Sequence, residues 1–235
     1  MSDKKTILAI GAHPDDIEFG CSITVRNFIK NGYEAYYVII TNGENGFKIP
    51  AKSKQERIII RRKEQLQAAK KTGVKKVYFL GFKDGFLEYS DTLRKKITLL
   101  IRKIKPEILF SFDPANTDFD SVNLFHRDHR ITALAAFDAV FAAKNRFIYK
   151  NNIHTEHTVS KIYFFGTNKP NLFLDISQDI DFKLDLLSSF KSQFPDFNQF
   201  ANFFKEKIVY HNTEYKFAEV FRVLEVVQIP SGELS

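Results

Sequence analysis

Short apolar runs alternate with amphipathic stretches along most of the chain, and this alternation is typical of an α/β protein. The runs are rich in β-branched and aromatic residues and are bounded by glycine, proline or polar residues, as buried strands usually are. We expect strands at residues 7–10, 36–40, 77–80, 108–112, 162–165, 172–176 and 218–229. We expect helices, where apolar residues recur at helical spacing, at residues 19–30, 54–73, 93–104, 131–141 and 180–190.

The order of these elements predicts a Rossmann-like, mostly parallel sheet with helices on both faces. Strand–helix–strand units give parallel strands joined by right-handed crossovers. The strands at 162–165 and 172–176 are too close in sequence for a crossover helix, so we expect the C-terminal part to be antiparallel or irregularly connected. The 235 residues contain no internal repeat or low-complexity tract, and they suit a single domain spanning residues 1–235.

One of the expected helices has clear boundary residues at both ends. Ser53 and Glu56 form a capping box at the start of the second helix, and Gly73 is placed to end it. The phenylalanine-rich segment at 194–204 is expected to be either core under the pocket or a subunit contact. The apolar residues that we assign to the second and fourth helices are Ile59, Leu66, Ala69, Ile131, Leu134, Ala135 and Phe141.

Polar and conformationally rigid residues follow directly on the first expected strand. Pro14 cannot continue a central strand, so His13, Asp15 and Asp16 come just past its carboxyl end, where open α/β sheets bind their ligands. Neighbouring carboxylates repel each other unless a positive charge lies beside them. A divalent metal is the simplest such charge, because His and Asp are both zinc ligands. The alternative is an ordinary polar turn with a surface histidine.

A second polar cluster, residues 126–129, precedes the helix at 131–141. His126 and His129 are three residues apart at the entry to this helix, with Asp128 between them. Ligands gathered from distant segments suit a catalytic zinc, which takes three protein ligands and leaves one position for water. The alternative is a plain helix start at which Asp128 complements the helix dipole. A further His-x-x-His pattern, His154 to His157, has no clear helix around it, and we do not expect it to bind metal.

The overall charge changes this picture little. A net charge of +7 and an isoelectric point near 9.3 are compatible with an anionic partner, but the basic residues are spread along the expected helices. We therefore expect no nucleic-acid partner. The single cysteine, Cys21, excludes an intramolecular disulfide and is expected in the core. Because no signal peptide and no run of ~18 apolar residues is present, we expect a cytoplasmic protein without a membrane span.

The two polar clusters, Ala12–Asp16 and His126–His129, resemble the A-H-P-D-D and H-P-D-H motifs of the PIG-L/LmbE-like zinc-dependent N-deacetylases. The similarity extends along most of the chain, because the segments 41–46, 175–177 and 218–221 resemble later motifs of the same family in the same order. Arg61 with Glu64 also resembles its R-x-x-E helix. Two residues depart from the family pattern: Arg127 stands where proline is usual, and Ser22 where glycine is frequent.

The resemblance implies a Zn²⁺ cofactor and a role for each polar residue. Asp15 would accept a proton from water, and His126 would stabilise the oxyanion or protonate the departing amine. Asp128 would orient His126, and Arg61 would reach toward the substrate. The zinc ligands implied by the family are His13, Asp16 and His129.

The resemblance also implies that the enzyme removes the acetyl group from an N-acetylated amino sugar of the N-acetylglucosamine type. The products would be acetate and a free amine, and the positive charge suggests a small-molecule substrate that carries an anionic group. Two alternatives stay open, a zinc-dependent hydrolase of another amide or ester and a non-catalytic sugar- or nucleotide-binding module. The family is often oligomeric, so a homo-oligomer also stays open.

Overall fold

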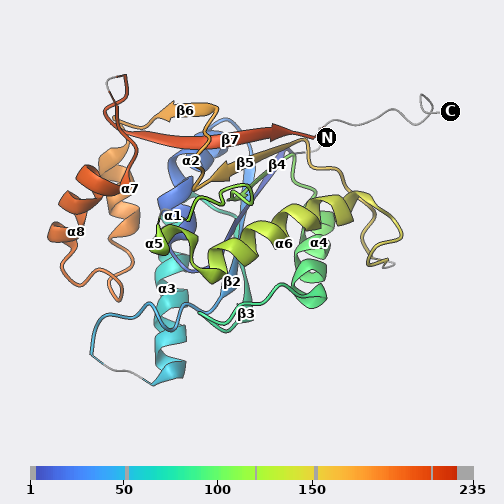
Figure 1. Ribbon diagram of the computed structural model, residues 1–235, viewed down its shortest axis with the longest axis horizontal. Helices are drawn as coiled ribbons and strands as arrows, with labels where there is room; N and C mark the ends of the chain where they lie inside the picture. Colours follow the sequence, from blue (N-terminus) through green and yellow to red (C-terminus); the bar gives the residue numbers. More distant parts are fainter. Residues whose placement is uncertain (1–3, 51–52, 120, 151–152, 213, 227–235) are drawn as a thin grey trace.

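A seven-stranded sheet runs through the centre of the protein in the order β3-β2-β1-β4-β5-β7-β6 (Figure 1). The structure is a computed structural model that describes residues 4–50, 53–119, 121–150, 153–212 and 214–226. The strands β1 to β4 pair in parallel, and β5 continues this parallel arrangement beside β4. The strands are β1 (Thr6–Gly11), β2 (Glu34–Thr41), β3 (Lys76–Phe82), β4 (Ile108–Phe112), β5 (Lys161–Phe165), β6 (Leu172–Asp175) and β7 (Ala218–Glu225).

The C-terminal strands are antiparallel, as the short spacing between them predicts. Strand β7 lies between β5 and β6 and runs antiparallel to both. The expected last strand covered residues 218–229, and its final residues, 227–229, lie outside the described part of the chain. The mostly parallel, Rossmann-like sheet inferred from the sequence is therefore confirmed.

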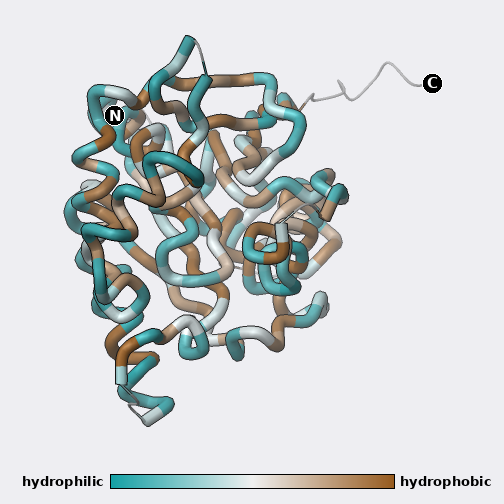
Figure 2. Tube along the Cα trace, turned by 60° about the vertical axis from the view of Figure 1, so that its left-hand side comes forward, coloured by the Kyte–Doolittle hydropathy of each residue, from teal (hydrophilic) through white to brown (hydrophobic). Residues whose placement is uncertain are grey.

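Helices cover both faces of the sheet, because the parallel strands alternate their buried side chains between two apolar layers. One layer packs Leu8 and Ile10 of β1 against α4 and α6, and the other packs Ile7 and Ala9 against α1, α2 and α3. Figure 2 shows the hydrophobic stretches concentrated inside the molecule. The helices are α1 (Asp16–Gly20), α2 (Ser22–Lys30), α3 (Lys54–Thr72), α4 (Asp91–Ile104), α5 (Val122–Phe125), α6 (Arg127–Lys144), α7 (Ile180–Leu187), α8 (Phe197–Phe203) and the π-helix η1 (Phe204–Ile208).

The single helix expected at residues 19–30 is wrong, because the structure has two helices here that meet at Cys21. The φ and ψ angles of Cys21 are −152° and 11°, outside the helical region. The break follows Gly20, which packs so closely on Phe165 that a Cβ atom there would lie 2.6 Å from the ring. Cys21 itself is fully buried, as expected.

The buried faces of α3 and α6 also differ from the apolar residues that we assigned to them. On α3, Ile59 and Leu66 are exposed, and the buried face carries mainly polar side chains. On α6, Leu134 and Phe141 are exposed while alanines face the sheet. Small residues let α6 lie close to β1 and β4, and the polar face of α3 is needed at the site described below.

Helices α7, α8 and η1 form a third apolar cluster at one end of the molecule (Figure 1). Phe194 and Phe200 stack with their centroids 3.8 Å apart, and both contact Phe19 of α1 edge-on. Phe204 is buried in this cluster, whereas Phe203 is 54% exposed. The expectation that this segment contributes to the core holds for Phe204. Among the described residues, no helix is both long and apolar enough to cross a membrane.

Candidate metal centre and active site

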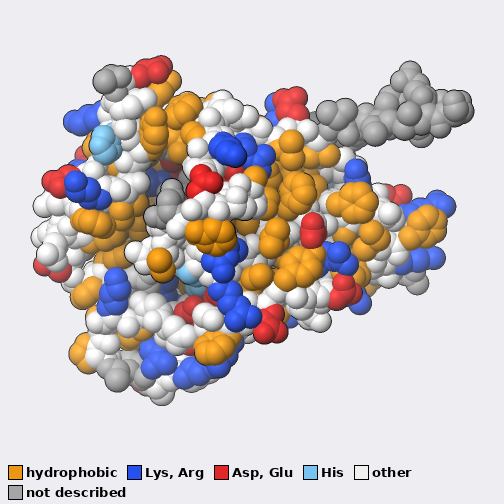
Figure 3. All heavy atoms as spheres, in the orientation of Figure 1, with side chains coloured by type: hydrophobic (Ala, Val, Ile, Leu, Met, Phe, Trp, Pro, Cys, Tyr) orange, Lys and Arg blue, Asp and Glu red, His pale blue; other side chains and the backbone are white. Residues whose placement is uncertain are grey.

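The polar side chains of the site gather where the loops after β1 and β3 meet the start of α6. His13 comes from the first loop and Asp16 from the start of α1 directly after it, Asp84 comes from the second loop, and His129 from the first turn of α6. Figure 3 shows histidine and acidic side chains in a hollow beside α5, bordered by lysine and arginine side chains. This position, beyond the carboxyl ends of parallel strands, is the one that the sequence predicts.

The turn after β1 holds Asp16 in a fixed orientation. Asp16 is the first residue of α1, and its Oδ2 accepts a hydrogen bond of 2.7 Å from the backbone N–H of His13. Asp15 precedes the helix with φ at 102°, a left-handed conformation that is uncommon for a residue with a side chain. Asp15 and Asp16 are both more than nine-tenths buried, so their charges are costly unless they are compensated.

The start of α6 fixes the second histidine. His129 stacks on Phe112 at the end of β4, with ring centroids 4.1 Å apart, and its Nδ1 lies 2.8 Å from the carbonyl oxygen of Leu124. A carbonyl oxygen can only accept, so Nδ1 carries a hydrogen, and Nε2 is the nitrogen left to bind a cation. Nε2 faces His13 and Asp16.

Two imidazole nitrogens and the carboxylate of Asp16 converge with the spacing of a metal site. The Nε2 of His129 lies 3.2 Å from His13 Nδ1 and 3.2 Å from an oxygen of Asp16. His13 Nδ1 lies 3.4 Å from the other oxygen of Asp16. Tetrahedral zinc with ligands at about 2.1 Å would separate its ligand atoms by roughly 3.4 Å. The distances and the N/O donor set therefore fit a zinc-type ion, which His13, Asp16 and His129 would hold.

Carboxylates on the other side of His13 support the same conclusion. His13 Nε2 lies 3.2 Å from Asp128 Oδ2 and 3.2 Å from Asp84 Oδ1. Burial opposes protonation of His13, but the charge of Asp16 and the hydrogen bonds to these carboxylates raise its pKa well above the usual value. Since Nε2 donates to carboxylates, a metal ion at this site would displace the proton from Nδ1. A site with this surplus of negative charge favours a cation.

Asp128 orients a different histidine from the one expected. The sequence analysis placed its carboxylate behind His126, but its Oδ2 lies at hydrogen-bonding distance from His13. The same oxygen accepts from the backbone N–H of Gly85 at 2.7 Å, and Oδ1 accepts from Leu87 at 3.2 Å. Asp128 thereby ties α6 to the loop after β3. Asp84 was missed in the sequence, although its position just after β3 was a usable signal.

Asp15 and Arg61 form a buried pair beside the cluster of His13, Asp16 and His129. The Arg61 guanidinium donates to Asp15 Oδ2 at 3.1 Å and to the carbonyl oxygen of Pro14, and only 1% of the residue is exposed. Burial raises the pKa of Asp15 to about 6, while the charge of Arg61 acts in the opposite direction. The substrate-binding role of Arg61 stays a prediction, and the contact seen is with Asp15.

His126 lies against the other two histidines, and the three rings form a group whose nitrogens could also hold a metal ion. The ring centroid of His126 is 3.9 Å from that of His129 and 5.0 Å from that of His13. Burial and repulsion from His129 and His13 lower the pKa of His126 to about 4, so its imidazole is neutral at pH 7. A neutral imidazole next to the cluster of His13, Asp16 and His129 can donate an N–H hydrogen bond to a developing negative charge.

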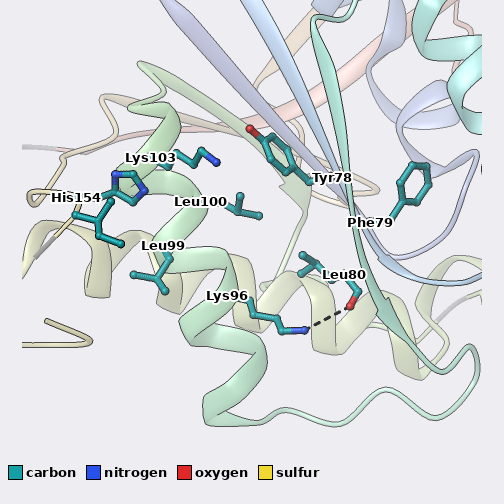
Figure 4. Close-up of a pocket in the computed structure, with 9 residues that line it drawn as sticks. Tyr78, Phe79, Leu80, Lys96, Leu99, Leu100, Lys103 and His154 are labelled. Carbon is teal, nitrogen blue, oxygen red and sulfur yellow. Dashed lines mark hydrogen bonds between the residues drawn. The ribbon is translucent and has the colours of Figure 1, made fainter. Parts of the chain in front are cut away.

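The second His-x-x-His pattern is not part of this site. His157 Nε2 lies 2.8 Å from the carbonyl oxygen of Pro106, and His154 lines a hollow between β3 and α4 (Figure 4). Lys96, Lys103, His154 and Tyr78 carry the polar groups of an otherwise apolar hollow, which shares no residue with the histidine cluster. Within the described ranges, neither His154 nor His157 belongs to a group with metal-binding geometry.

A His–Asp–His cluster at the carboxyl edge of a Rossmann-like sheet, with a separate buried carboxylate beside it, is the arrangement of a metal-dependent hydrolase. The family model described as "PIG-L: GlcNAc-PI de-N-acetylase" matches residues 8–140. More than half of the chain is covered by this match, and the chain belongs to the PIG-L family of deacetylases. The family inferred from the motifs is confirmed.

Individual relatives are similar over most of the chain. A diacetylchitobiose deacetylase of Thermococcus kodakarensis is 33% identical over 199 residues, which are 83% of this chain and 73% of that protein. A probable N-acetyl-alpha-D-glucosaminyl L-malate deacetylase 2 of Bacillus anthracis is 25% identical over 205 residues, covering 83% and 84%. The solved N,N'-diacetylchitobiose deacetylase of Pyrococcus horikoshii, complexed with its inhibitor MPG, has a TM-score of 0.81 at 30% identity, covering 95% of this chain and 85% of that chain.

Proposed function

We propose that the protein is a zinc-dependent deacetylase that hydrolyses the N-acetyl group of an amino sugar of the N-acetylglucosamine type. The observation that carries this proposal is the convergence of His13 Nδ1, His129 Nε2 and Asp16 within 3.2–3.4 Å of one another. The names of the relatives, which are deacetylases of amino-sugar compounds, support the substrate class. In this reaction a C–O bond forms, the C–N bond breaks, and the products are acetate and the free amine.

In this proposal His13, Asp16 and His129 hold the ion. Zinc would supply Lewis acidity and would lower the pKa of a water molecule from ~15.7 toward ~7. The Asp15 carboxylate accepts a proton from the attacking water, and a pKa of about 6 suits an acceptor that must be ionised at neutral pH. Asp128 and Asp84 hold the His13 ring through Nε2.

His126 has the second chemical role in this proposal. Its neutral imidazole donates a hydrogen bond to the oxyanion that forms when the carbonyl carbon becomes tetrahedral. The proton taken up by Asp15 must then reach the departing nitrogen, and the neutral ring of His126 can relay it. A module that only bound sugar would require neither Asp15 nor His126 beside the ligand atoms, which favours catalysis over the binding alternative.

The proposal includes three further assignments. One sheet containing strands from Thr6 to Glu225 supports a single domain spanning residues 1–235. The substrate is a small molecule, and the net charge of +7 supports an anionic group on it. Arg61 keeps its proposed substrate-binding role on the resemblance to the family; in the structure its guanidinium is buried and Nη1 lies 3.6 Å from Glu64 Oε2.

The test is a panel assay for acetate release from N-acetylglucosamine, its short oligomers and its anionic conjugates. Acetate should appear with at least one amino sugar, disappear after treatment with a chelator, and return when Zn²⁺ is restored. Cleavage of an unrelated amide without acetate release from any amino sugar would reject the substrate class. Acetate release that is unaffected by removal of all bound metal would reject the metal centre.

A further inference from the structure

The peptide unit between Pro14 and Asp15 is held at both ends by one helix. Its carbonyl oxygen accepts a hydrogen bond from Arg61 Nη2, and its N–H donates to Gln65 Oε1 at 3.0 Å. Arg61 and Gln65 are four residues apart on α3, so they lie on the same face of the helix. This arrangement accounts for the polar buried face of α3, because that face binds backbone groups rather than apolar side chains.

Gln65 has both ends of its amide engaged. Oε1 accepts from Asp15, and Nε2 donates to Glu18 Oε1 at 2.9 Å. Gln65 and Glu18 are both fully buried. A buried amide with hydrogen bonds at each end has one low-energy orientation, because turning it over would place its NH₂ group against the Asp15 N–H.

The conformation that Gln65 holds is unfavourable without support. Asp15 has φ at 102°, and a residue with a Cβ atom keeps such a value only when its surroundings impose it. The orientation of the Pro14–Asp15 peptide sets this angle, and the angle sets where the Asp15 carboxylate points. Without the Gln65 acceptor, the buried Asp15 N–H would be unsatisfied, and rotation of the peptide would become the favourable response.

We propose that Gln65 is a positioning residue that aims the Asp15 carboxylate by fixing the Pro14–Asp15 peptide. This inference rests on the proposed function, because it assigns Asp15 the role of proton acceptor. Arg61 contacts both the peptide and the Asp15 carboxylate, so a change there mixes two effects. The contact of Gln65 with Asp15 is to the backbone N–H, which makes Gln65 the cleaner test.

The experiment compares Gln65→Met with Gln67→Met in the zinc-loaded enzyme. Methionine has nearly the size of glutamine but no oxygen acceptor, and Gln67 is an exposed residue on the same helix. Q65M should lower kcat about 10- to 100-fold, as expected for a misplaced catalytic group, with KM changed less than about threefold. Zinc content should stay unchanged, and Q67M should behave as wild type. If Q65M does not fold, Gln65→Asn moves the acceptor oxygen back by one methylene group, and it should likewise lower kcat much more than it changes KM.

Two further readouts separate positioning from a general structural role. In an Asp15→Asn background, Q65M should lower the residual kcat less than about twofold, because the carboxylate that Gln65 aims is already absent. Amide hydrogen exchange at Asp15 should accelerate in Q65M and stay slow in Q67M. An unchanged kcat in Q65M, an equal loss in both backgrounds, or unchanged exchange would overturn the proposal. Hydrogen exchange can be measured without substrate. If exchange at Asp15 is faster in Q65M but the wild-type protein does not deacetylate any amino sugar, the proposed function is rejected, while the role of Gln65 in fixing the Pro14–Asp15 peptide is retained.

Discussion

Replacing Asp128 with asparagine should weaken metal binding without removing a ligand. The Asp128 carboxylate is fully buried and accepts three hydrogen bonds, from His13 Nε2 and from the backbone N–H groups of Gly85 and Leu87. Two of these bonds end on Oδ2 and one on Oδ1. The amide of asparagine has a single acceptor oxygen, so it cannot replace all three.

The better orientation of the new amide puts its oxygen at the position of Oδ2. The hydrogen bonds from His13 and Gly85 are then kept. The new NH₂ group takes the place of Oδ1, which accepts from the Leu87 N–H at 3.2 Å in the wild type, so two donors face each other. The negative charge of Asp128 is also lost, which leaves Asp84 as the one carboxylate described beside His13 Nε2, and His13 becomes a weaker base toward the metal. Loss of an outer-shell partner typically reduces metal affinity 10- to 100-fold. This reduction corresponds to about 1.4–2.8 kcal/mol, since a tenfold change is 1.4 kcal/mol.

The measurement is a competition titration of zinc against a chromophoric chelator, performed on wild type, Asp128→Asn and Asp118→Asn. Asp118 is an exposed acid in the loop before α5, so D118N controls for the loss of one negative charge. The Kd of D128N should rise 10- to 100-fold, and that of D118N should stay within about twofold of wild type. Equal changes in both variants, or no change in D128N, would show that Asp128 does not act through His13.

Other substitutions probe the remaining roles. His129→Ala removes a proposed ligand, and metal analysis should show loss of the bound ion; full occupancy would reject the ligand set. Asp15→Asn should keep the metal but lower kcat about 10²- to 10⁴-fold, and a loss below about tenfold would contradict its role as proton acceptor. Lys183→Met removes the cation that pairs with the buried carboxylate of Glu219 at 2.5 Å and leaves that charge only the hydrogen bonds from Ile23 and Thr24, so it should cost about 3–5 kcal/mol of folding free energy. Calorimetry should show a Tm roughly 6–10 °C lower, and an unchanged Tm would mean that these hydrogen bonds suffice for Glu219.

The amino-acid sequence by itself determined the architecture and the place of the site. The strands are recognisable because each buried parallel strand must be an apolar run, and the intervening helices then require a mostly parallel sheet. His13 and Asp16 follow the first such run directly, and the carboxyl ends of parallel strands meet at one edge. The two motifs also identify the family, because they combine residue types and spacings that a turn or a helix start has no reason to share.

Only the tertiary structure decided which partner each polar side chain has. Asp128 bonds to His13 rather than supporting His126, and Asp84 joins the same nitrogen, because the loop after β3 crosses the start of α6. Periodicity ranks helix faces by apolar content, so it assigned Ile59 and Leu66 to α3 as its apolar residues and could not identify a buried polar face.

The buried face of α3 shows the physical reason for this limit. Arg61 and Gln65 are buried because they bind the backbone of a turn some fifty residues away. Their burial is favourable only because these backbone groups supply hydrogen-bond partners. Hydropathy along a chain records how each residue partitions between water and an apolar interior. It does not record which distant donor meets which acceptor, and that pairing fixes the conformation of Asp15 and the aim of its carboxylate.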